Sequence, residues 1–394
     1  MDLERVDALL TADGRELLGR ATALRSEGVG DLRTAEVLRR DHPADLVAAV
    51  LTQVELRERA RAKFDRAGEM LFTRAGLEQA STRIVAEHRA RRFAGFDSMA
   101  DLCTGIGGDL IFLAAAGRVA AVDIDEVHSR LAVHNASVYG VDANVTAIVR
   151  DVREADLAGV EAVFVDPARR TDRGRLGPGA SEPPLSWCLG LAGSPAGGGH
   201  PAGGPPVAIK AAPGLPPALV PDGWELEFVA EGRDLKEAVL WSPALAGPRR
   251  RATVLPGDHE LVATPGPPVP TRAPGAYLID PNPAVTRAGL VEDLARRLGA
   301  WKIDPRIAFL ATDREVDTPF GRTLRVRASL PWREAAIAAE LRRLDVGSVD
   351  IRRRGLAGDV ERARRAFRLS GTRRATVAMT RVDDRPWALI CLEA

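Results

Sequence analysis

Apolar residues recur every three to four positions through the first 95 residues of the chain. One set comprises Leu9, Leu10, Leu17, Leu18 and Leu24, and another comprises Val47, Val50, Leu51 and Val54. This spacing places the side chains of each set on one face of a helix. Residues 1–95 are therefore predicted to form a helical N-terminal region.

Beyond residue 95, short apolar runs alternate with helical stretches, which predicts a parallel sheet flanked by helices. The candidate strands are 98–103, 118–123, 144–149, 160–165, 206–210, 224–230 and 237–242. Helices are expected to start near Gly107 and Glu126. The last two candidate strands have only a short connection between them, so we expect them to close the sheet as a hairpin.

Proline and glycine divide the rest of the chain. A Gly/Pro-rich loop at 171–206 interrupts the sheet domain, where it could act as a substrate lid or simply be flexible. A second Pro/Gly-rich stretch at 256–275 reads as a linker. After it, strand-like and helical runs alternate again. The predicted domains are a helical region at 1–95, a sheet domain at 96–255 and a second α/β module at 276–394.

A glycine-rich turn follows the first predicted strand. Residues 101–109 read D-L-C-T-G-I-G-G-D, and Asp123 ends the next apolar run. Because glycine has no Cβ, Gly105 and Gly107 let the backbone approach a ligand closely. A glycine turn that opens a helix, followed by an acidic residue about 20 positions later, is typical of a nucleoside-containing cofactor site. A tight strand-to-helix connection without a ligand is the alternative.

The acidic residues beside this turn favour one kind of cofactor. A dinucleotide site has the spacing G-x-G-x-x-G, which this turn lacks, and the carboxylates of Asp101 and Asp109 would repel a pyrophosphate. They suit a ligand with an ammonium group and no phosphate, such as S-adenosylmethionine. Asp101 is expected to accept a hydrogen bond from the amino group, and Asp123 from both ribose hydroxyls.

These motifs resemble the class I S-adenosylmethionine-dependent methyltransferases. They are the glycine turn, V-D-I-D at 122–125 and H-N-A-S-V-Y-G at 134–140. The last is similar to a segment of trimethylguanosine-synthase-like RNA methyltransferases. From about residue 60 onward, the chain resembles bacterial methyltransferases with a C-terminal THUMP-like domain. The resemblance implies a Rossmann-like seven-stranded sheet, methyltransferase activity and a THUMP-like fold for 276–394.

The resemblance also implies cofactor contacts beyond the glycine turn. Gln79 and Ser81 match a polar pair that covers the methionine end, and Asp151 matches a neighbour of the adenine amino group. The alternatives are an ordinary helix start at 79–81 and a helix cap at Asp151. The expected cofactor-binding residues are Gln79, Ser81, Asp101, Thr104, Gly105, Gly107, Asp123, Ile124, Asp151 and Asp166.

The sequence D-P-A-R at 166–169 resembles the Asp/Asn-Pro-Pro-aromatic motif of amino- and RNA-methylating members. There Asp166 would orient or deprotonate the acceptor, and Pro167 would fix the backbone. Arg169 stands where an aromatic residue would stack on a base, which puts an exocyclic amine acceptor in question, although arginine can itself stack on a base or clamp a phosphate. Lys210 ends the fifth predicted strand and would bind the substrate or form a structural salt bridge. We expect Asp166, Pro167, Arg169 and Lys210 to be the catalytic residues.

Charge is unevenly distributed along the chain. Residues 271–394 contain 24 Lys and Arg against 16 Asp and Glu, and residues 342–374 contain 11 Arg against 4 acidic residues. A basic module predicts a polyanionic partner, and Arg352, Arg353 and Arg354 would fit a phosphate track. The alternative is a general preference for arginine, since the whole chain has only Lys63, Lys210, Lys236 and Lys302.

Bulk composition is that of an ordinary globular protein, with 45% hydrophobic and 28% charged residues. No apolar run approaches the ~20 residues of a membrane span, and the first residues lack a secretory signal pattern. Cys103, Cys188 and Cys391 are too far apart for a metal motif or a disulfide framework. We therefore expect a cytoplasmic protein without a membrane partner or a metal.

Together these features predict S-adenosylmethionine-dependent methyl transfer to a base in RNA, with tRNA or rRNA as the partner and the oligomeric state left open. A methyltransferase acting on a protein or a small molecule is one alternative. A non-catalytic RNA-binding protein is the other, although the intact set of Asp101, Gly105, Gly107 and Asp123 argues against it.

Overall fold

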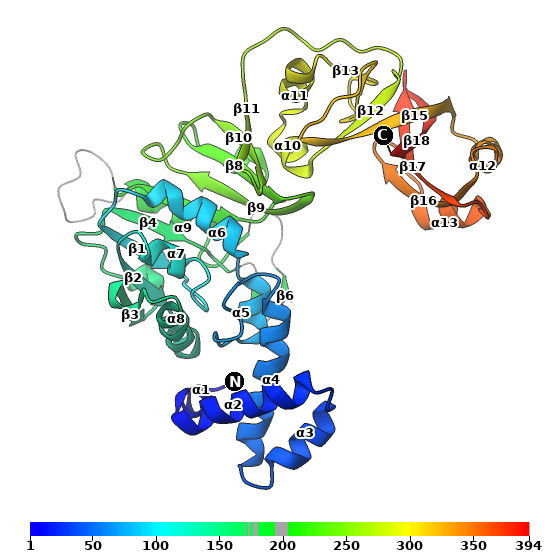
Figure 1. Cartoon of the computed structure of the whole chain (residues 1–394). Helices are drawn as coiled ribbons and strands as arrows, with labels where there is room; N and C mark the ends of the chain where they lie inside the picture. Colours follow the sequence, from blue (N-terminus) through cyan, green and yellow to red (C-terminus); the bar gives the residue numbers. More distant parts are fainter. Residues whose placement is uncertain (169, 172–173, 176–179, 194–203, 394) are drawn as a thin grey trace. The chain divides into compact units, whose positions relative to one another are not determined.

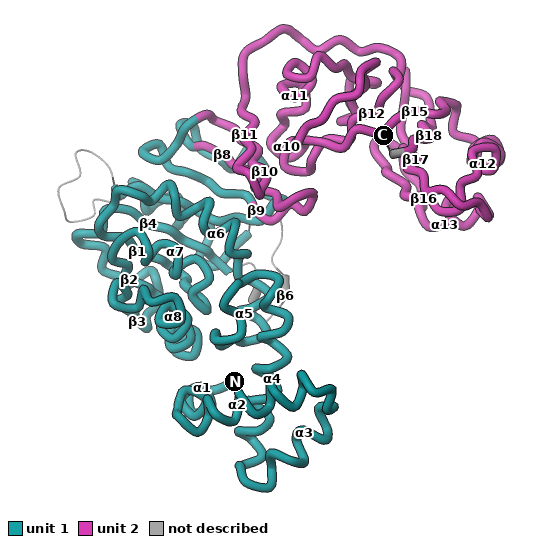
Figure 2. Tube along the Cα trace, viewed as in Figure 1, with its two compact units in different colours: residues 1–224, 238–247 teal, residues 225–237, 248–394 magenta. Residues whose placement is uncertain are grey.

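The computed structural model describes residues 1–168, 170–171, 174–175, 180–193 and 204–393. The chain forms two compact units, coloured separately in Figure 2. The first comprises residues 1–224 and 238–247, and the second comprises residues 225–237 and 248–394. The domain boundaries expected at residues 95, 255 and 275 stay a prediction.

The first unit begins with helices, as predicted. They are α1 (Leu3–Leu10), α2 (Ala12–Ser26), α3 (Asp31–Leu38), α4 (Ala44–Ala60), α5 (Arg74–Gln79), α6 (Arg83–Ala90) and the 3₁₀ helix η1 (Arg91–Phe93) (Figure 1). The predicted apolar positions are buried, with Leu9, Leu17 and Val50 in one core cluster. Asp2 and Thr11 cap the first two helices, which satisfies backbone N–H groups that a helix start leaves unpaired.

A mainly parallel sheet follows, as the alternation of apolar runs predicts. Its strands are β1 (Ser98–Leu102), β2 (Arg118–Asp123), β3 (Val145–Val149), β4 (Ala162–Val165), β7 (Val207–Ala211) and β9 (Asp234–Trp241), in the order β3-β2-β1-β4-β7-β9. Only β9 is antiparallel to its neighbour β7. The strand order reverses direction at β1, whose Asp101 pairs with Ala121 of β2 and Phe164 of β4. Ligands in such sheets bind at this reversal, outside the carboxyl ends of the strands.

The remaining elements of the first unit are mostly short. They are the helices α7 (Leu110–Ala114), α8 (Glu126–Val138) and α9 (Leu185–Gly190), the strands β5 (Arg170–Thr171) and β6 (Gly174–Arg175), and the 3₁₀ helices η2 (Asp142–Asn144), η3 (Val152–Glu154), η4 (Leu191–Gly193) and η5 (Pro217–Leu219). The helix expected near Gly107 starts at Leu110. The delay has a backbone cause, because Gly105 and Gly107 have φ angles of 57° and 82°. Much of the expected lid at 171–206 lies outside the described residues.

Helices α6, α7 and α8 supply the apolar cover of the sheet (Figure 1). Phe93, which follows α6, packs edge-on against Phe164 of β4 at 6.4 Å between ring centroids and lies 6.3 Å from the ring of Trp241. Leu113 of α7 and Ala132 of α8 belong to the same buried cluster. This core fixes the strands whose carboxyl ends carry the candidate site.

Two buried amide side chains hold the segment that leads into α5. Asn135 of α8 accepts a hydrogen bond from Leu71 N at 2.9 Å and donates to Leu71 O at 3.0 Å and to Ile106 O at 2.9 Å. Gln53 of α4 pairs in the same way with Phe72, at 3.0 Å to its N and 2.8 Å to its O. We call Leu71–Phe72 the strap. The side-chain amides thus bond the backbone N–H and C=O groups of the strap, as the backbone of a neighbouring strand would do in a sheet.

The second unit contains a further sheet and the end of the predicted hairpin. Its strands are β8 (Glu225–Glu231), β10 (Arg250–Leu255), β11 (His259–Val262), β12 (Tyr277–Pro281), β13 (Trp301–Lys302), β14 (Leu310–Thr312), β15 (Gly321–Pro331), β16 (Val346–Arg353), β17 (Arg373–Val382) and β18 (Arg385–Glu393). Its helices are α10 (Pro283–Ala288), α11 (Val291–Leu298), α12 (Glu334–Arg343) and α13 (Val360–Ala366). Strand β8 neighbours β9, which confirms the expected hairpin. Strands β8, β10 and β11 continue the first sheet in the order β11-β10-β8-β9, so its described strands number nine, two more than the seven expected. The second sheet has the order β13-β14-β12-β15-β18-β17-β16.

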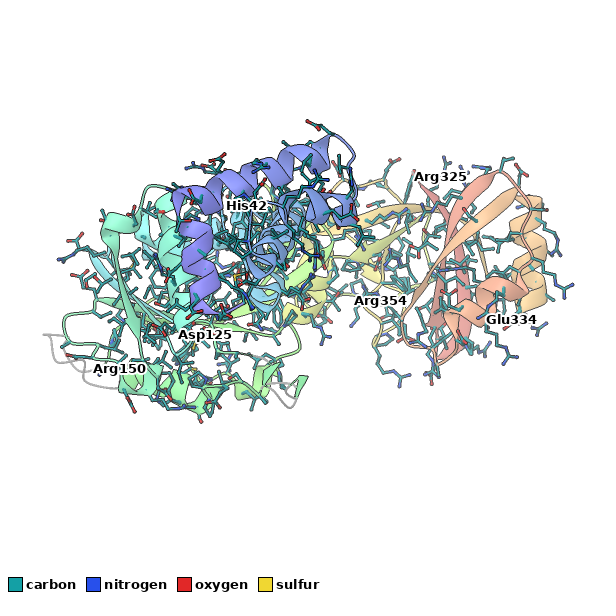
Figure 3. The ribbon with its side chains drawn as sticks, turned by 90° about the horizontal axis from the view of Figure 1, so that it is seen from below. His42, Asp125, Arg150, Arg325, Glu334 and Arg354 are labelled. Atoms are coloured by element: carbon teal, nitrogen blue, oxygen red, sulfur yellow. The ribbon has the colours of Figure 1, made fainter. Side chains whose placement is uncertain are left out.

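Both faces of this second sheet are covered. Ile337 of α12 and Phe367 after α13 pack on one face, whereas Ile303 and Phe309 belong to a separate apolar cluster that includes Leu324 of β15. Because the two buried clusters are apolar, most charged residues around this sheet lie at its edges and on the surface. Figure 3 shows two of them, Arg325 on β15 and Glu334 at the start of α12.

Asp280 gathers several arginines inside the second unit. It accepts from Arg233 at 2.8 Å and from Arg354 at 2.9 Å, and its side chain is buried. Asn282, two residues later, donates to Gly232 O at 2.8 Å. Of the arginines predicted to form a phosphate track, Arg354 (Figure 3) is thus already paired within the protein, and Arg352 pairs with Asp350 at 2.9 Å.

We predict that Asn135→Ala lowers the free energy of unfolding by about 2 to 4 kcal/mol, because it leaves the backbone groups of the strap buried and unpaired. Asn144 is a matched control, since it is exposed and makes one backbone contact, to Ala114 O at 2.8 Å. Asn144→Ala is expected to cost less than about 1 kcal/mol. Urea unfolding of both variants measures the difference, and equal losses would contradict the role of the strap.

Candidate active site

The glycine turn joins β1 to α7 through a backbone that only certain residues can adopt. Thr104 Oγ1 donates to Asp101 O at 2.8 Å and Gly107 N donates to Thr104 O at 3.1 Å, which closes the turn. A Cβ at Gly107 would lie 3.0 Å from Ala132 Cα of α8, whereas a Cβ at Gly105 would meet nothing within 4 Å. Gly107 therefore serves helix packing, and Gly105 faces open space.

A cavity of about 480 Å³ lies beside this turn in the first unit. Its lining residues are Gly76, Gln79, Ala80, Cys103, Thr104, Gly105, Ile106, Gly108, Asp109, Asp123, Ile124, Asp125, His128, Asp151, Val152, Arg153, Asp166, Ala168, Glu182 and Pro183. They come from the end of α5, the glycine turn and the segments after β2, β3 and β4. The cavity thus lies at the carboxyl ends of the parallel strands, where ligands of such sheets bind.

Most of the expected cofactor residues line this cavity. Those that do are Gln79, Thr104, Gly105, Asp123, Ile124, Asp151 and Asp166. Ser81, Asp101, Gly107, Pro167 and Lys210 are not among the lining residues, and Arg169 lies outside the described residues. The expected residues thus come from segments that meet at this cavity, and some of them lie in the layer behind its wall.

Asp123 connects the end of β2 to the glycine turn. Its Oδ2 accepts from Gly105 N at 2.7 Å, and its Oδ1 accepts from Asp125 N at 2.9 Å. Asp125 (Figure 3) in turn caps α8 through Val127 N at 2.8 Å. These contacts fix the carboxylate at the cavity wall, where each oxygen has a further lone pair for a hydroxyl group.

Apolar and acidic groups follow at the next strand ends. Ile124 is 71% exposed and lines the cavity, so it presents an apolar surface there. Asp151 accepts from Arg153 N at 2.9 Å and pairs with its guanidinium at 3.0 Å. The backbone hydrogen bond of Arg153 lowers the pKa of Asp151, with a smaller contribution from the Arg153 side chain. An exposed aliphatic side chain beside an ionised acceptor suits a planar base with an amino group.

Asp101 is a buried carboxyl group with an oxygen that the described residues leave without a hydrogen bond. It is 1% exposed, and its Oδ2 has no hydrogen-bond partner among the described residues. Burial, and then the charges of Asp166 and Asp123, raise the pKa of Asp101 to about 7. A buried carboxylate oxygen without a partner is costly, so this atom fits a ligand that donates hydrogen bonds, such as an ammonium group.

A chain of buried charges supports the cavity from behind. Arg89 of α6 is 2% exposed and pairs with Asp109 at the end of the glycine turn, while it donates to Ser81 Oγ at 3.2 Å. Its guanidinium also lies 4.9 Å from the ring centre of Phe164. Asp109, one of the acidic residues that flank the glycine turn, lines the cavity, and much of its charge is neutralised by Arg89. Ser81 belongs to this supporting layer.

Lys210 carries the charge network to the fourth strand. Its Nζ lies 2.6 Å from Asp166 Oδ2 and 3.8 Å from Asp109 Oδ2, and the side chain is 3% exposed. Among the described residues, Asp166 Oδ1 has no partner and is available to accept. Of the two roles expected for Lys210, substrate binding or a structural salt bridge, the structure shows the salt bridge. This pair positions the carboxylate of Asp166. Pro167 is buried directly after it.

Sequence reasoning missed several residues of the site. Arg89 is the main one, and its only signal is its position three residues after Ala86 and four after Val85 on the buried face of α6. His128 also lines the cavity and lies 3.1 Å from Thr73 Oγ1. Glu182, which follows the D-P-A-R segment at 166–169, also lines the cavity and pairs with Arg153. Nothing in the local sequence marks these contacts, because each joins distant segments.

The cavity offers what S-adenosylmethionine requires. Behind the wall, the orphaned Oδ2 of Asp101 could accept a hydrogen bond from the amino group. In the wall itself, Asp123 could accept from the ribose, and Ile124 with Asp151 could hold the adenine. Among the residues that the structure describes, no group of three or more His, Cys, Asp or Glu side chains could hold a metal ion. Within the same residues, no helix is both long and apolar enough to cross a membrane.

We predict that Arg89→Ala lowers the free energy of unfolding by about 3 to 5 kcal/mol, because it leaves Asp109 buried without its main partner. Arg83 lies on the same helix and pairs with Glu87 in an exposed position, so Arg83→Ala is expected to cost less than about 1 kcal/mol. Denaturant unfolding compares the two. Similar losses in both variants would show that the buried pair contributes nothing special.

We predict that Asp101→Asn stabilises the ligand-free protein by about 2 kcal/mol at pH 8 and changes little near pH 4. The pKa of Asp101 in the folded protein is raised, so the stability from its protonated form is complete below about pH 4 and is lost as the pH rises through about 7. Urea unfolding across this range measures the effect. Asp156→Asn, at an exposed position, is the control, and a constant difference from wild type at every pH would contradict the assignment.

The chain is similar in sequence and in fold to known methyltransferases. Residues 97–249 match the family model of RNA cap guanine-N2 methyltransferases, and residues 321–393 match that of THUMP-like domains. Residues 2–60 match a domain of unknown function. A crystal structure from Porphyromonas gingivalis, described as a methyltransferase, has a TM-score of 0.76, covers 96% of this chain and 98% of its own, and is 20% identical. The fold is therefore shared along nearly the whole chain.

Two relatives from strains of Mycobacterium tuberculosis are both named uncharacterized S-adenosylmethionine-dependent methyltransferases. Each is 34% identical over 328 residues, which cover 80% of this chain and 85% of the relative. This identity and coverage point to the same family as the sheet order, the glycine turn and the carboxylates at the strand ends. The chain therefore belongs to the S-adenosylmethionine-dependent methyltransferases.

Proposed function

We propose that this methyltransferase acts on RNA and transfers the methyl group to an exocyclic amino nitrogen of a base. The observation that carries the proposal is the position of Asp166. Its carboxylate lines the cofactor cavity at the carboxyl end of β4, with Oδ2 held by Lys210 at 2.6 Å. The remaining oxygen can accept a hydrogen bond from an incoming N–H group.

The protein's own groups would act mainly by positioning. Bound S-adenosylmethionine supplies an electrophilic methyl group on a sulfonium centre. Asp166 then orients the amine so that its nitrogen lone pair points into the cavity, and Pro167 restricts the backbone that carries this carboxylate. Lys210 offsets the charge of Asp166 and holds its carboxylate at the cavity wall. Asp166 is also the group that would receive the proton of the methylated amine.

Two further observations support RNA as the substrate. The family model matched at 97–249 is named for methylation of guanine N2 in an RNA cap, and residues 321–393 match a THUMP-like domain. The last 124 residues also carry an excess of arginine, with 24 Lys and Arg against 16 acidic residues in 271–394. A basic module beside a methyltransferase fold suits a polyanionic substrate.

The test uses the full-length enzyme, S-adenosylmethionine with a labelled methyl group, and a lysate from cells that lack this protein. Label is expected in RNA, and mass spectrometry of the nucleosides would identify the methylated base. Label confined to protein or to small molecules would overturn the RNA substrate. A methylated ring nitrogen or ribose would overturn the exocyclic amine.

We predict that Asp166→Asn reduces the rate of methyl transfer by about 100-fold or more, while the affinity for S-adenosylmethionine changes by less than about threefold. The variant keeps the side-chain shape but loses the anionic acceptor. Asp156→Asn removes a carboxylate from an exposed turn of the same unit and is expected to keep full activity. Calorimetry and a methyl-transfer assay separate the two effects. Unchanged transfer in Asp166→Asn would remove this residue from the reaction.

A further inference from the structure

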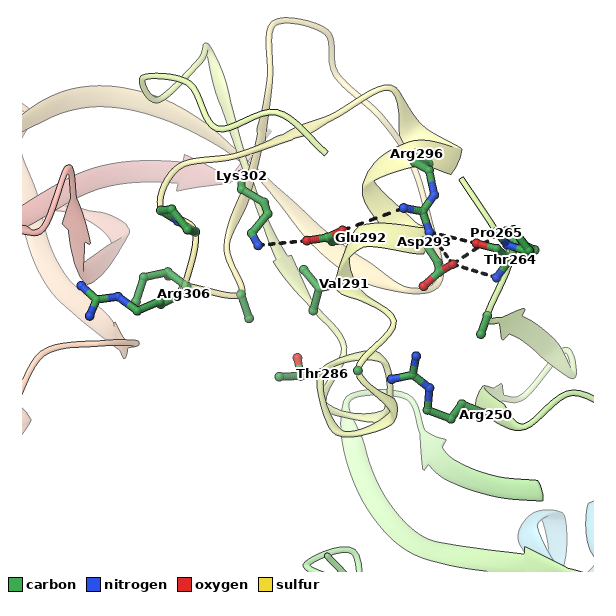
Figure 4. Close-up of a pocket in the computed structure, with 15 residues that line it drawn as sticks. Arg250, Thr264, Pro265, Thr286, Val291, Glu292, Asp293, Arg296, Lys302 and Arg306 are labelled. Atoms are coloured by element: carbon green, nitrogen blue, oxygen red, sulfur yellow. Dashed lines mark hydrogen bonds and ion pairs between the residues drawn. The ribbon is translucent and has the colours of Figure 1, made fainter. Parts of the chain in front are cut away.

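A second cavity, of about 670 Å³, lies within the second unit (Figure 4). Its wall comes from the start of β10, the segment after β11, the connection between α10 and α11, and residues 302–308. All of these lie outside the THUMP-like match at 321–393. Four cations and two carboxylates line it, namely Arg250, Arg296, Lys302, Arg306, Glu292 and Asp293.

Both carboxylates are already occupied by partners in the wall. Asp293 accepts from Arg296 at 2.7 Å and from Thr264 N at 2.9 Å. Glu292 pairs with Lys302 at 3.1 Å, and dashed lines in Figure 4 follow these contacts along α11. Two acids therefore offset two cations, which leaves Arg250 and Arg306 as the excess positive charge.

Arg250 is a cation of this wall that has no partner among the described residues. Among the described residues, its guanidinium makes no hydrogen bond and no ion pair. It lies against Gly289, where a Cβ would be 2.7 Å from Arg250 Nη1. Gly289 ends α10 with a φ angle of 70°, so glycine serves there both the backbone conformation and the space for the guanidinium.

Arg306 contributes a second charge that is only partly offset. Its partner Asp384 is 67% exposed, lies outside the cavity wall and also pairs with Arg381 at 2.9 Å. One carboxylate thus serves two arginines. The cavity presents guanidinium groups, which match the oxygens of a phosphate in shape and charge.

We propose that this cavity binds a phosphate group and, resting on the proposed function, that the phosphate belongs to the backbone of the RNA substrate. It would be a contact separate from the THUMP-like domain. A backbone phosphate fits better than a base, because the wall offers charged donors and has no aromatic side chain among its lining residues. Free polyphosphate is the other source of the same chemistry.

The test measures binding of fluorescein-labelled transfer RNA by the full-length protein, with Arg250→Ala compared with Arg287→Ala. Arg287 is an exposed arginine of α10 that does not line the cavity, so both variants lose one positive charge. Arg250→Ala is expected to weaken binding about tenfold and to lower the slope of log affinity against log salt by about 0.7 to 1. Arg287→Ala is expected to change neither. Thermal unfolding should be unaffected in both.

Inorganic tripolyphosphate as a competitor distinguishes the two sources. Binding of tripolyphosphate that depends on Arg250, together with RNA binding that does not, would keep the phosphate site and overturn its RNA assignment. Equal behaviour of both variants toward both probes would overturn the site. Methyl transfer is read separately, so an enzyme that methylates RNA without needing Arg250 refutes this inference alone. RNA binding that needs Arg250 but yields no methylated RNA refutes only the proposed reaction.

Discussion

The site depends on how buried cations compensate the carboxylates that a parallel sheet gathers at one edge. The carboxylates that converge there are those of Asp101, Asp109, Asp123 and Asp166. Left unpaired, so many buried or half-buried anions would cost several kcal/mol each. Two buried cations, Arg89 and Lys210, reach them from behind. Burial, together with the charges of Asp166 and Asp123 that the cations do not neutralise fully, raises the pKa of Asp101 to about 7.

This incomplete compensation suits a protein that must bind a positively charged ligand. A fully neutralised edge would be more stable but would offer little to an ammonium or sulfonium group. The orphaned oxygen of Asp101 and the free oxygen of Asp166 are the two places where the network stops short. Stability is reduced at the point where binding takes place, as is common for sites that must prefer a ligand over water.

Sequence patterns predicted the parts of this arrangement that depend on local chain geometry. The strands, the glycine turn and the position of Asp123 follow from spacing within about 20 residues. Arg89 could not be found in that way, since no motif links it to Asp109 and its helix looks like any other basic helix. Asp109 was used only as an acidic flank of the glycine turn, because its sequence position says nothing of the guanidinium behind it.

Charge counting was similarly incomplete in the second unit. It marked residues 342–374 as the most basic stretch, but Arg352 and Arg354 there already have carboxylate partners. Arg250, whose guanidinium has no hydrogen bond or ion pair among the described residues, lies in a stretch that composition did not single out. Local density of charge therefore differs from available charge, since only the folded chain shows which arginines have been satisfied.

The strap bears on where the catalytic part of the chain begins. The matched methyltransferase model starts at residue 97, yet the peptide groups of Leu71 and Phe72 depend on Gln53 and Asn135. Gln53 lies on α4, within the match to a domain of unknown function. A fragment cut at the family boundary would lose the cover of the cofactor cavity together with its anchor. We therefore expect the smallest autonomous enzyme to include α4, because the helical region before the sheet holds part of the cavity wall in place.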